Sequence, residues 1–141
     1  MSDRRPSFPT VTPGLLYHDA PNAIEWLCRV FGFAQRVVVP GANGRIVHAH
    51  LTFGNGGVML SSAEGYAFPG MCKSPRDVGG VGTAEIIVHV ADPDAHYRHA
   101  VTQGATIVLP LEDKPFGGRG YACRDPEGYV WAFASYNAWA E

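Results

Sequence analysis

Histidine and glutamate side chains that could bind a metal ion or move a proton occur in two strand-like runs of the sequence. His48 and His50 stand two residues apart in one run, and Glu85 and His89 stand four apart in the other. Side chains alternate across a β-strand, so each pair points to one face of its strand. Imidazole and carboxylate groups are common metal ligands and common general acids and bases. The two runs therefore predict the polar walls of a binding or catalytic site.

Three interpretations of these residues follow from their chemistry. If Glu85 lies in an apolar cavity, loss of water raises its pKa toward a value suited to a general base, with His89 or Arg124 as counter-charge. His48 and His50 have a spacing that some metal sites use, which would give a rearranged divalent-metal site. Alternatively, the histidines line a solvated surface, and Glu85 is a strand-edge residue that pairs with a neighbouring Lys or Arg.

The elements that must position these residues show an internal repeat. Asp19-Ala20-Pro21 opens one predicted helix, which Gly32 ends, and Asp92-Pro93 opens another, which Gly104 ends. Aspartate caps a helix N-terminus, proline fits its first turn, and glycine adopts the left-handed conformation past its end. Asp92 follows Asp19 by 73 residues, and Gly104 follows Gly32 by 72. This common period predicts a duplicated module.

Each predicted helix is preceded by one strand-like run and followed by three. The runs are about 11–17, 34–39, 45–53 and 57–62 in the first half, and about 84–90, 105–111, 119–124 and 129–136 in the second. Residues 1–141 therefore read as one α+β domain of two βαβββ modules, at about 11–63 and 83–136. A Gly- and Pro-rich linker at about 64–82 joins them.

The apolar positions of the strands indicate which face packs under a helix. The predicted core sets are Ile86, Val88 and Val90; Val47, Ala49, Leu51 and Phe53; and Tyr129, Trp131 and Phe133. The opposite faces carry His48, His50, Glu85 and His89. If the halves turn these faces toward each other, they enclose a concave cavity suited to a small molecule. His96 and His99, on the second helix, are predicted to face solvent.

Composition restricts the classes of partner. With 46% hydrophobic and 17% charged residues, the 141-residue chain is globular in character. A net charge of −2 with dispersed Lys and Arg predicts no nucleic-acid partner. No apolar run approaches the length of a signal peptide or membrane span. Three widely spaced cysteines predict free thiols, and we expect a cytoplasmic protein without a membrane partner.

Three segments resemble a known family, and the resemblance covers about residues 13–136. The segments are Asp19 to Phe33, Val90 to Tyr97, and Arg124 to Trp131. Together with the duplicated βαβββ pattern, they resemble the vicinal oxygen chelate superfamily, which includes glyoxalase I, extradiol dioxygenases and bleomycin-binding proteins. The closest similarity is to small bacterial glyoxalase-like proteins. The resemblance implies a curved, partly closed eight-stranded sheet with helices on its outer face, and it implies a homodimer that can exchange modules between chains.

The resemblance also implies where metal ligands would lie. Metal-dependent members carry a ligand on the first strand of each module and a Glu on the last. Alignment on the helix starts and glycine turns puts Thr12, Leu60, Glu85 and Ala132 there, of which only Glu85 is a good ligand. A catalytic ion normally takes about three protein ligands, so no cofactor is predicted, with a divalent metal as the alternative.

The function predicted from these observations is metal-independent binding of a small molecule in the cavity between the modules. The predicted ligand-binding residues are His48, His50, Glu85, His89, Arg124, Phe116 and Arg119, the last two in a loop that resembles one bordering the pocket of related proteins. Glu85 is the predicted catalytic residue if a reaction occurs. One alternative is a metal-dependent lyase, isomerase or dioxygenase with displaced ligands. Another is sequestration of a bleomycin-type antibiotic.

Overall fold

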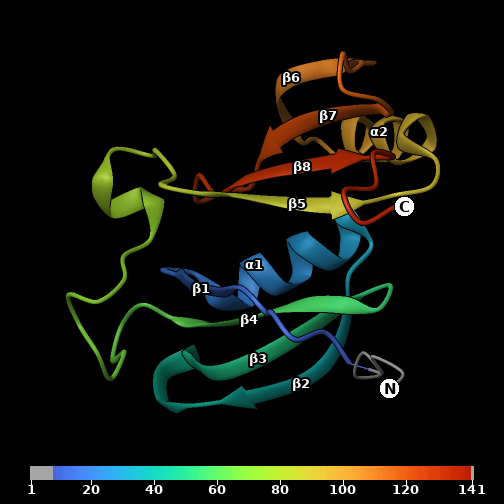
Figure 1. The fold of residues 1–141 in the computed structure, drawn as a ribbon. Helices are drawn as coiled ribbons and strands as arrows, with labels where there is room; N and C mark the ends of the chain where they lie inside the picture. The colour runs from blue at the N-terminus through green and yellow to red at the C-terminus, as the bar shows by residue number, and fades with distance from the viewer. Residues whose placement is uncertain (1–7, 141) are drawn as a thin grey trace.

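The computed structural model describes residues 8–140 and contains eight strands and two main helices (Figure 1). The first module comprises β1 (Gly14–Tyr17), α1 (Ala20–Trp26), β2 (Ala34–Pro40), β3 (Ile46–Phe53) and β4 (Gly56–Ser62). The second comprises β5 (Glu85–His89), α2 (Pro93–Thr102), β6 (Thr106–Asp113), β7 (Arg119–Arg124) and β8 (Val130–Ala134). The predicted α+β fold of tandem βαβββ modules is confirmed.

The strands form two sheets of the same topology. Sheet 1 has the order β1-β4-β3-β2 and sheet 2 the order β5-β8-β7-β6. In each, the first strand pairs in parallel with the last, and the remaining pairs are antiparallel. Within one chain the sheets remain separate, so a single curved eight-stranded sheet is not formed.

The helix signals of the sequence operate as predicted. The Asp19 carboxylate accepts a hydrogen bond from the backbone N–H of Asn22, and the Asp92 carboxylate accepts one from Ala95. Gly32 and Gly104 have φ values of 89° and 93°, which glycine adopts without strain. After Trp26 the first helix widens into a π-helical turn, η1 (Leu27–Phe31).

Both helices lie in one core that the two sheets share. Figure 1 shows α1 between β5 and sheet 1. The Phe31 ring, from η1, lies 5.3 Å from the Trp131 ring and 4.6 Å from the Phe133 ring, both on the helix-facing side of sheet 2. Within one chain the helices therefore lie between the sheets rather than on an outer face, because η1 packs across sheet 2 and buries aromatic surface there.

The turn between β7 and β8 contacts the first module through two buried carboxylates, those of Asp125 and Glu127. Oδ2 of Asp125 accepts hydrogen bonds from the Tyr17 hydroxyl (2.6 Å) and the Trp131 indole (3.1 Å), and Oδ1 accepts three backbone N–H groups of its own turn. Glu127 accepts the backbone N–H groups of His18 (2.6 Å) and Asp19 (2.8 Å), just before α1. Burial raises the pKa of Asp125, and these donors oppose that shift.

Two predicted side-chain orientations are wrong. Val47 is exposed because β3 carries an extra residue there: Val39 pairs with His48 while Pro40 pairs with Ile46, and Ile46 takes the core position instead. His96 does not face solvent, because its ring nitrogens contact Tyr121 and Phe31. No helix among residues 8–140 combines the length and apolarity needed to cross a membrane.

Candidate functional site

The open face of sheet 1, which points away from the shared core, combines imidazoles with apolar side chains. His50, on β3, lies opposite Val37 on β2 and opposite Met59 on β4. His48, also on β3, lies opposite Val39 on β2. Residues directly opposite each other share a face. Val37, Val39 and Met59 are each about two-fifths exposed, at 42%, 42% and 41%. The predicted pair His48 and His50 therefore shares one face and lies among apolar groups.

The open face of sheet 2 is arranged in rows across β5, β8 and β7. In the first row Val130 pairs with Glu85 and with Arg124. The middle row is apolar and consists of Ile87, Ala132 and Ala122, and the third contains His89, Ala134 and Gly120. The pairing register thus brings the predicted residues Glu85, His89 and Arg124 onto one face.

The two open faces do not meet within one chain. Their opposite sides share a single core, so each open face points away from the other module. Glu85 and His89 are exposed, and Ile87 between them is 68% exposed. The predicted hollow between the modules of one chain is therefore not formed. The burial on which the general-base role of Glu85 depended is also missing in a single chain.

Arg124 is oriented toward the linker and the β7–β8 turn. Its Nη1 donates to the backbone carbonyls of Gly80 (2.9 Å) and Gly128 (3.0 Å). In the described part of the chain no ion pair joins Arg124 to Glu85. These bonds fix Arg124 at the end of the first row, where it supplies a positive charge at the rim of the face.

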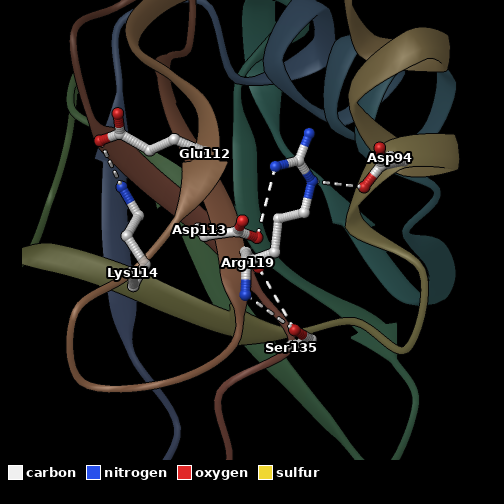
Figure 2. Close-up of polar contacts among 6 residues, drawn as sticks. All are labelled: Asp94, Glu112, Asp113, Lys114, Arg119 and Ser135. Atoms are coloured by element: carbon white, nitrogen blue, oxygen red, sulfur yellow. Dashed lines mark hydrogen bonds and ion pairs between the residues drawn. The ribbon is translucent and has the colours of Figure 1, made fainter.

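Arg119 is occupied by carboxylates on the helix-facing side of sheet 2. Figure 2 shows its guanidinium between Asp94, at the start of α2, and Asp113, at the end of β6. Nε lies 2.9 Å from Asp94 Oδ1 and Nη1 lies 3.4 Å from Asp113 Oδ1. The hydrogen bond to Asp94, above all, raises the pKa of Arg119. This geometry separates Arg119 from Glu85 and His89.

Phe116 lies at the exposed tip of the loop that connects β6 to β7. Its ring packs edge-on against Tyr136 at 5.2 Å, beyond the end of β8. The structure thus does not bring Phe116 and Arg119 together with the four predicted residues of the open faces.

Two grooves separate β5 from the first module. One, of about 650 Å³, lies between β1 and β5 beneath the linker and includes Leu15, Tyr129, Met71 and Val81, with Glu85 in its wall. The other, of about 570 Å³, includes Phe33, Phe53 and Trp139, with His89 in its wall. Both grooves are mainly apolar, and each continues onto the open face of sheet 2 at one end of β5.

The strand register corrects one of the positions that correspond to family metal ligands. Gly14 pairs with Met59 in the first module, and Ile87 pairs with Ala132 in the second. Both strands therefore repeat at 73 residues, as the aspartate N-caps of the helices do. Met59 is therefore the counterpart of Ala132, whereas Leu60 is buried in the core. The positions then hold Thr12, Met59, Glu85 and Ala132.

That residue set does not suit a divalent ion. One carboxylate with a thioether, a hydroxyl and a methyl group provides fewer than the three good ligands a catalytic ion takes. Within residues 8–140, no three His, Cys, Asp or Glu side chains cluster in a way that could hold a metal. The side chains present at these positions therefore do not fit a metal ion.

The sequence is similar to a known family and to proteins of other organisms. Residues 10–133 match the family model described as Glyoxalase/Bleomycin resistance protein/Dioxygenase superfamily. The chain is 33% identical over 124 residues to the uncharacterized protein Mb0911c of Mycobacterium bovis, a match that covers 88% of this chain and 81% of the relative.

Solved structures share the fold. TioX from Micromonospora sp. ML1 is 37% identical, with a TM-score of 0.73 over 92% of this chain and 99% of its own. A glyoxalase/bleomycin resistance protein/dioxygenase from Nocardioides is 20% identical, with a TM-score of 0.67 over 94% of this chain and 87% of its own, and shows likeness of fold alone.

Proposed function

Because the chain belongs to the glyoxalase/bleomycin resistance protein/dioxygenase superfamily, and because its polar residues lie on two apolar open faces, we propose that it binds a small molecule without a metal. The ligand site is the hollow between the open face of sheet 1 in one copy and the open face of sheet 2 in a second copy. The observation that carries the proposal is the exposure of both faces in the single chain.

The exposed apolar surface favours a second copy as the cover of these faces. Five apolar side chains within the strands are all at least 41% exposed: Val37, Val39 and Met59 on sheet 1, and Ile87 and Leu109 on sheet 2. Contiguous exposed apolar surface is typical of an interaction or binding surface. The helix-facing sides of both sheets are already buried in the shared core, so the open faces are the sides of the sheets that remain available for association.

A two-fold arrangement satisfies both faces at once. If sheet 1 of one copy lies opposite sheet 2 of its partner, the symmetry axis generates the reverse pairing, which gives a closed homodimer with two equal hollows. Each hollow then has His48 and His50 on one wall and Glu85, His89 and Arg124 on the other. Enclosure removes water from Glu85 and restores the environment that its role as a base requires.

The chemistry of the walls favours a mainly apolar ligand with polar groups at its ends. Ile87, Ala132 and Leu109 give the middle of sheet 2 an apolar surface, while Glu85 and Arg124 stand at one end and His89 at the other. Small-molecule sites usually combine an apolar lining with a few polar groups that fix orientation. Such walls can bind and orient a ligand by packing and hydrogen bonds.

The proposal is tested by the oligomeric state and ligand response of Ile87→Glu, with Val101→Glu as control. Both residues are exposed apolar residues, but Val101 lies on α2 rather than on an open face. We expect sedimentation to give a dimer for wild type and Val101→Glu, and a folded monomer for Ile87→Glu. In a thermal-shift screen of dicarbonyl adducts and phenolics, a bound compound should raise the melting temperature of the dimeric proteins only. A monomeric wild type, or ligand binding by monomeric Ile87→Glu, would refute the composite site.

A further inference from the structure

His96 lies at the junction of the two modules and uses both ring nitrogens there. From α2, its Nε2 lies 2.9 Å from the backbone carbonyl oxygen of Phe31 in η1. Its Nδ1 lies 2.6 Å from the hydroxyl of Tyr121 in β7. The ring stacks on Phe133 with 4.1 Å between centroids. The contacts thus connect the first module with the helix and sheet of the second.

These partners determine the tautomer of the neutral ring. A carbonyl oxygen can only accept, so Nε2 carries the hydrogen and donates it to Phe31. Nδ1 is then the acceptor, and the Tyr121 hydroxyl donates to it. The neutral imidazole therefore satisfies both neighbours, and Tyr121 is itself almost fully buried.

Among residues 8–140, the groups that contact the His96 ring include no carboxylate that could stabilise a positive charge on it. Around the ring lie the aromatic rings of Phe31, Phe53, Tyr121 and Phe133. The nearby titratable groups are Tyr121, His99 one turn along α2, and Tyr97, which packs edge-on against Tyr121. The carboxylate of Asp92 accepts the backbone N–H of Ala95, and the carboxylate of Asp94 is paired with Arg119. Burial lowers the pKa of His96, the Phe31 carbonyl opposes the shift, and His99 adds to it.

We propose that His96 is a proton-sensitive latch, which holds the two modules together when neutral and loosens their junction when protonated. Protonation places a hydrogen on Nδ1, opposite the hydroxyl hydrogen of Tyr121. The hydroxyl must then turn its hydrogen away from His96 inside an aromatic core, where leaving a buried donor unsatisfied costs free energy. The contact across the junction is weakened at that point.

The sign of the pH effect follows from proton binding. The folded protein binds a proton at His96 less readily than the unfolded chain, whose histidines titrate near pH 6.5. The contribution of neutral His96 is therefore present above that pH and is lost as pH falls from about 6.5 through the lower pKa of the folded state. This loss requires neither the dimer nor a ligand.

His99 provides a matched control on the same helix. Its Nε2 lies 2.8 Å from the backbone carbonyl oxygen of Arg29, also in η1, but the residue is exposed. A protonated His99 keeps that donor, and its positive charge lies near carbonyls at the end of a helical turn, where cations are favoured. Protonation of His99 should therefore not weaken the junction.

The test compares the fall in melting temperature between about pH 7.5 and about pH 5 in three proteins. His96→Gln keeps a donor for Phe31 but cannot take up a proton, and His99→Gln is the control. We expect wild type and His99→Gln to lose at least about 4 °C more than His96→Gln. An equal loss in all three proteins overturns the latch.

A titration of the wild-type imidazoles by NMR decides the matter if His96→Gln does not fold. The imidazole of His96 should titrate below the ordinary histidine value near pH 6.5. Amide exchange at Gly32 and Phe33, corrected for its intrinsic pH dependence, should accelerate as His96 titrates. Titration of His96 at or above about pH 6.5, or unchanged protection of these amides, overturns the proposal.

Discussion

The hydroxyl of Tyr17 donates a 2.6 Å hydrogen bond to the carboxylate of Asp125, across 108 residues of sequence. Tyr17 ends β1 of the first module, and Asp125 begins the turn between β7 and β8 of the second. The same carboxylate oxygen accepts the Trp131 indole hydrogen, so one buried group joins both modules. The turn between β7 and β8 is therefore also a connection between the modules.

Removing the charge of Asp125 should destabilise the fold strongly. The Asp125 carboxylate accepts five hydrogen bonds through its two oxygens. The side-chain amide of the variant Asp125→Asn has only one acceptor oxygen, and its NH₂ group would point at donors that the second carboxylate oxygen now accepts. We expect the free energy of unfolding to fall by about 2–4 kcal/mol, measured by urea unfolding. Tyr17→Phe, which removes one donor, should cost about 1–2 kcal/mol. Additive effects in the double variant would show that the bond does not couple the modules.

Glu127 should stabilise the start of α1 from the other module. Its carboxylate accepts two backbone N–H groups that precede the helix, at His18 and Asp19, and it is only 7% exposed. Glu127→Gln should therefore lower the free energy of unfolding by about 1–3 kcal/mol. Glu25→Gln, an exposed position on α1, should change it by less than about 0.5 kcal/mol. Equal effects in the two variants would contradict this role.

The three cysteines should differ widely in reactivity. Burial raises the pKa of Cys123 to about 12, and burial also raises the pKa of Cys28, whereas Cys72 is exposed in the linker. The thiolate is the reactive form, so Cys72 should react first with a thiol reagent at about pH 8, and Cys123 only on unfolding. Peptide mass spectrometry after timed labelling measures the order. Early labelling of Cys123 would contradict its place in the core.

The residue set at the family metal positions predicts that the protein works without a divalent ion. Elemental analysis of the purified protein should give well under one equivalent of Ni, Zn, Mn or Fe. EDTA should leave the melting temperature unchanged within about 1 °C, because a tightly bound ion would stabilise the fold measurably. Near-stoichiometric metal together with a fall in melting temperature on addition of EDTA would favour a metal-dependent lyase, isomerase or dioxygenase with displaced ligands.

Local signals in the sequence predicted the elements well, because helix caps and strand alternation act over a few residues. The Asp19 and Asp92 caps, the glycine stops and all eight strands are present. Alternation also identified which residues share a face, as for His48 with His50 and Glu85 with His89. It does not determine which faces meet, since either side of a sheet with apolar residues can be covered by a helix, a module or another chain.

Other errors arose where a single residue changes the register or where contacts are distant. The extra residue at Val47 reverses its side chain, and Leu60 was aligned one position away from the open-face residue Met59. The partners of His96 are 65 and 25 residues away, so its burial has almost no local signal. The exception is that His96 and His99 on α2 and Gln103 at its C-cap follow one side of the helix. That stripe contacts η1 and could have indicated a polar junction.

The most direct test of the composite site is photo-crosslinking from the open face of sheet 1. A photoreactive phenylalanine analogue placed at Met59 should form crosslinks between chains, and peptide mapping should find them on Glu85–His89 or Val130–Ala134 of a second copy. Crosslinks confined to one chain, or a protein that stays monomeric and uncrosslinked at high concentration, would contradict a ligand hollow built from two copies.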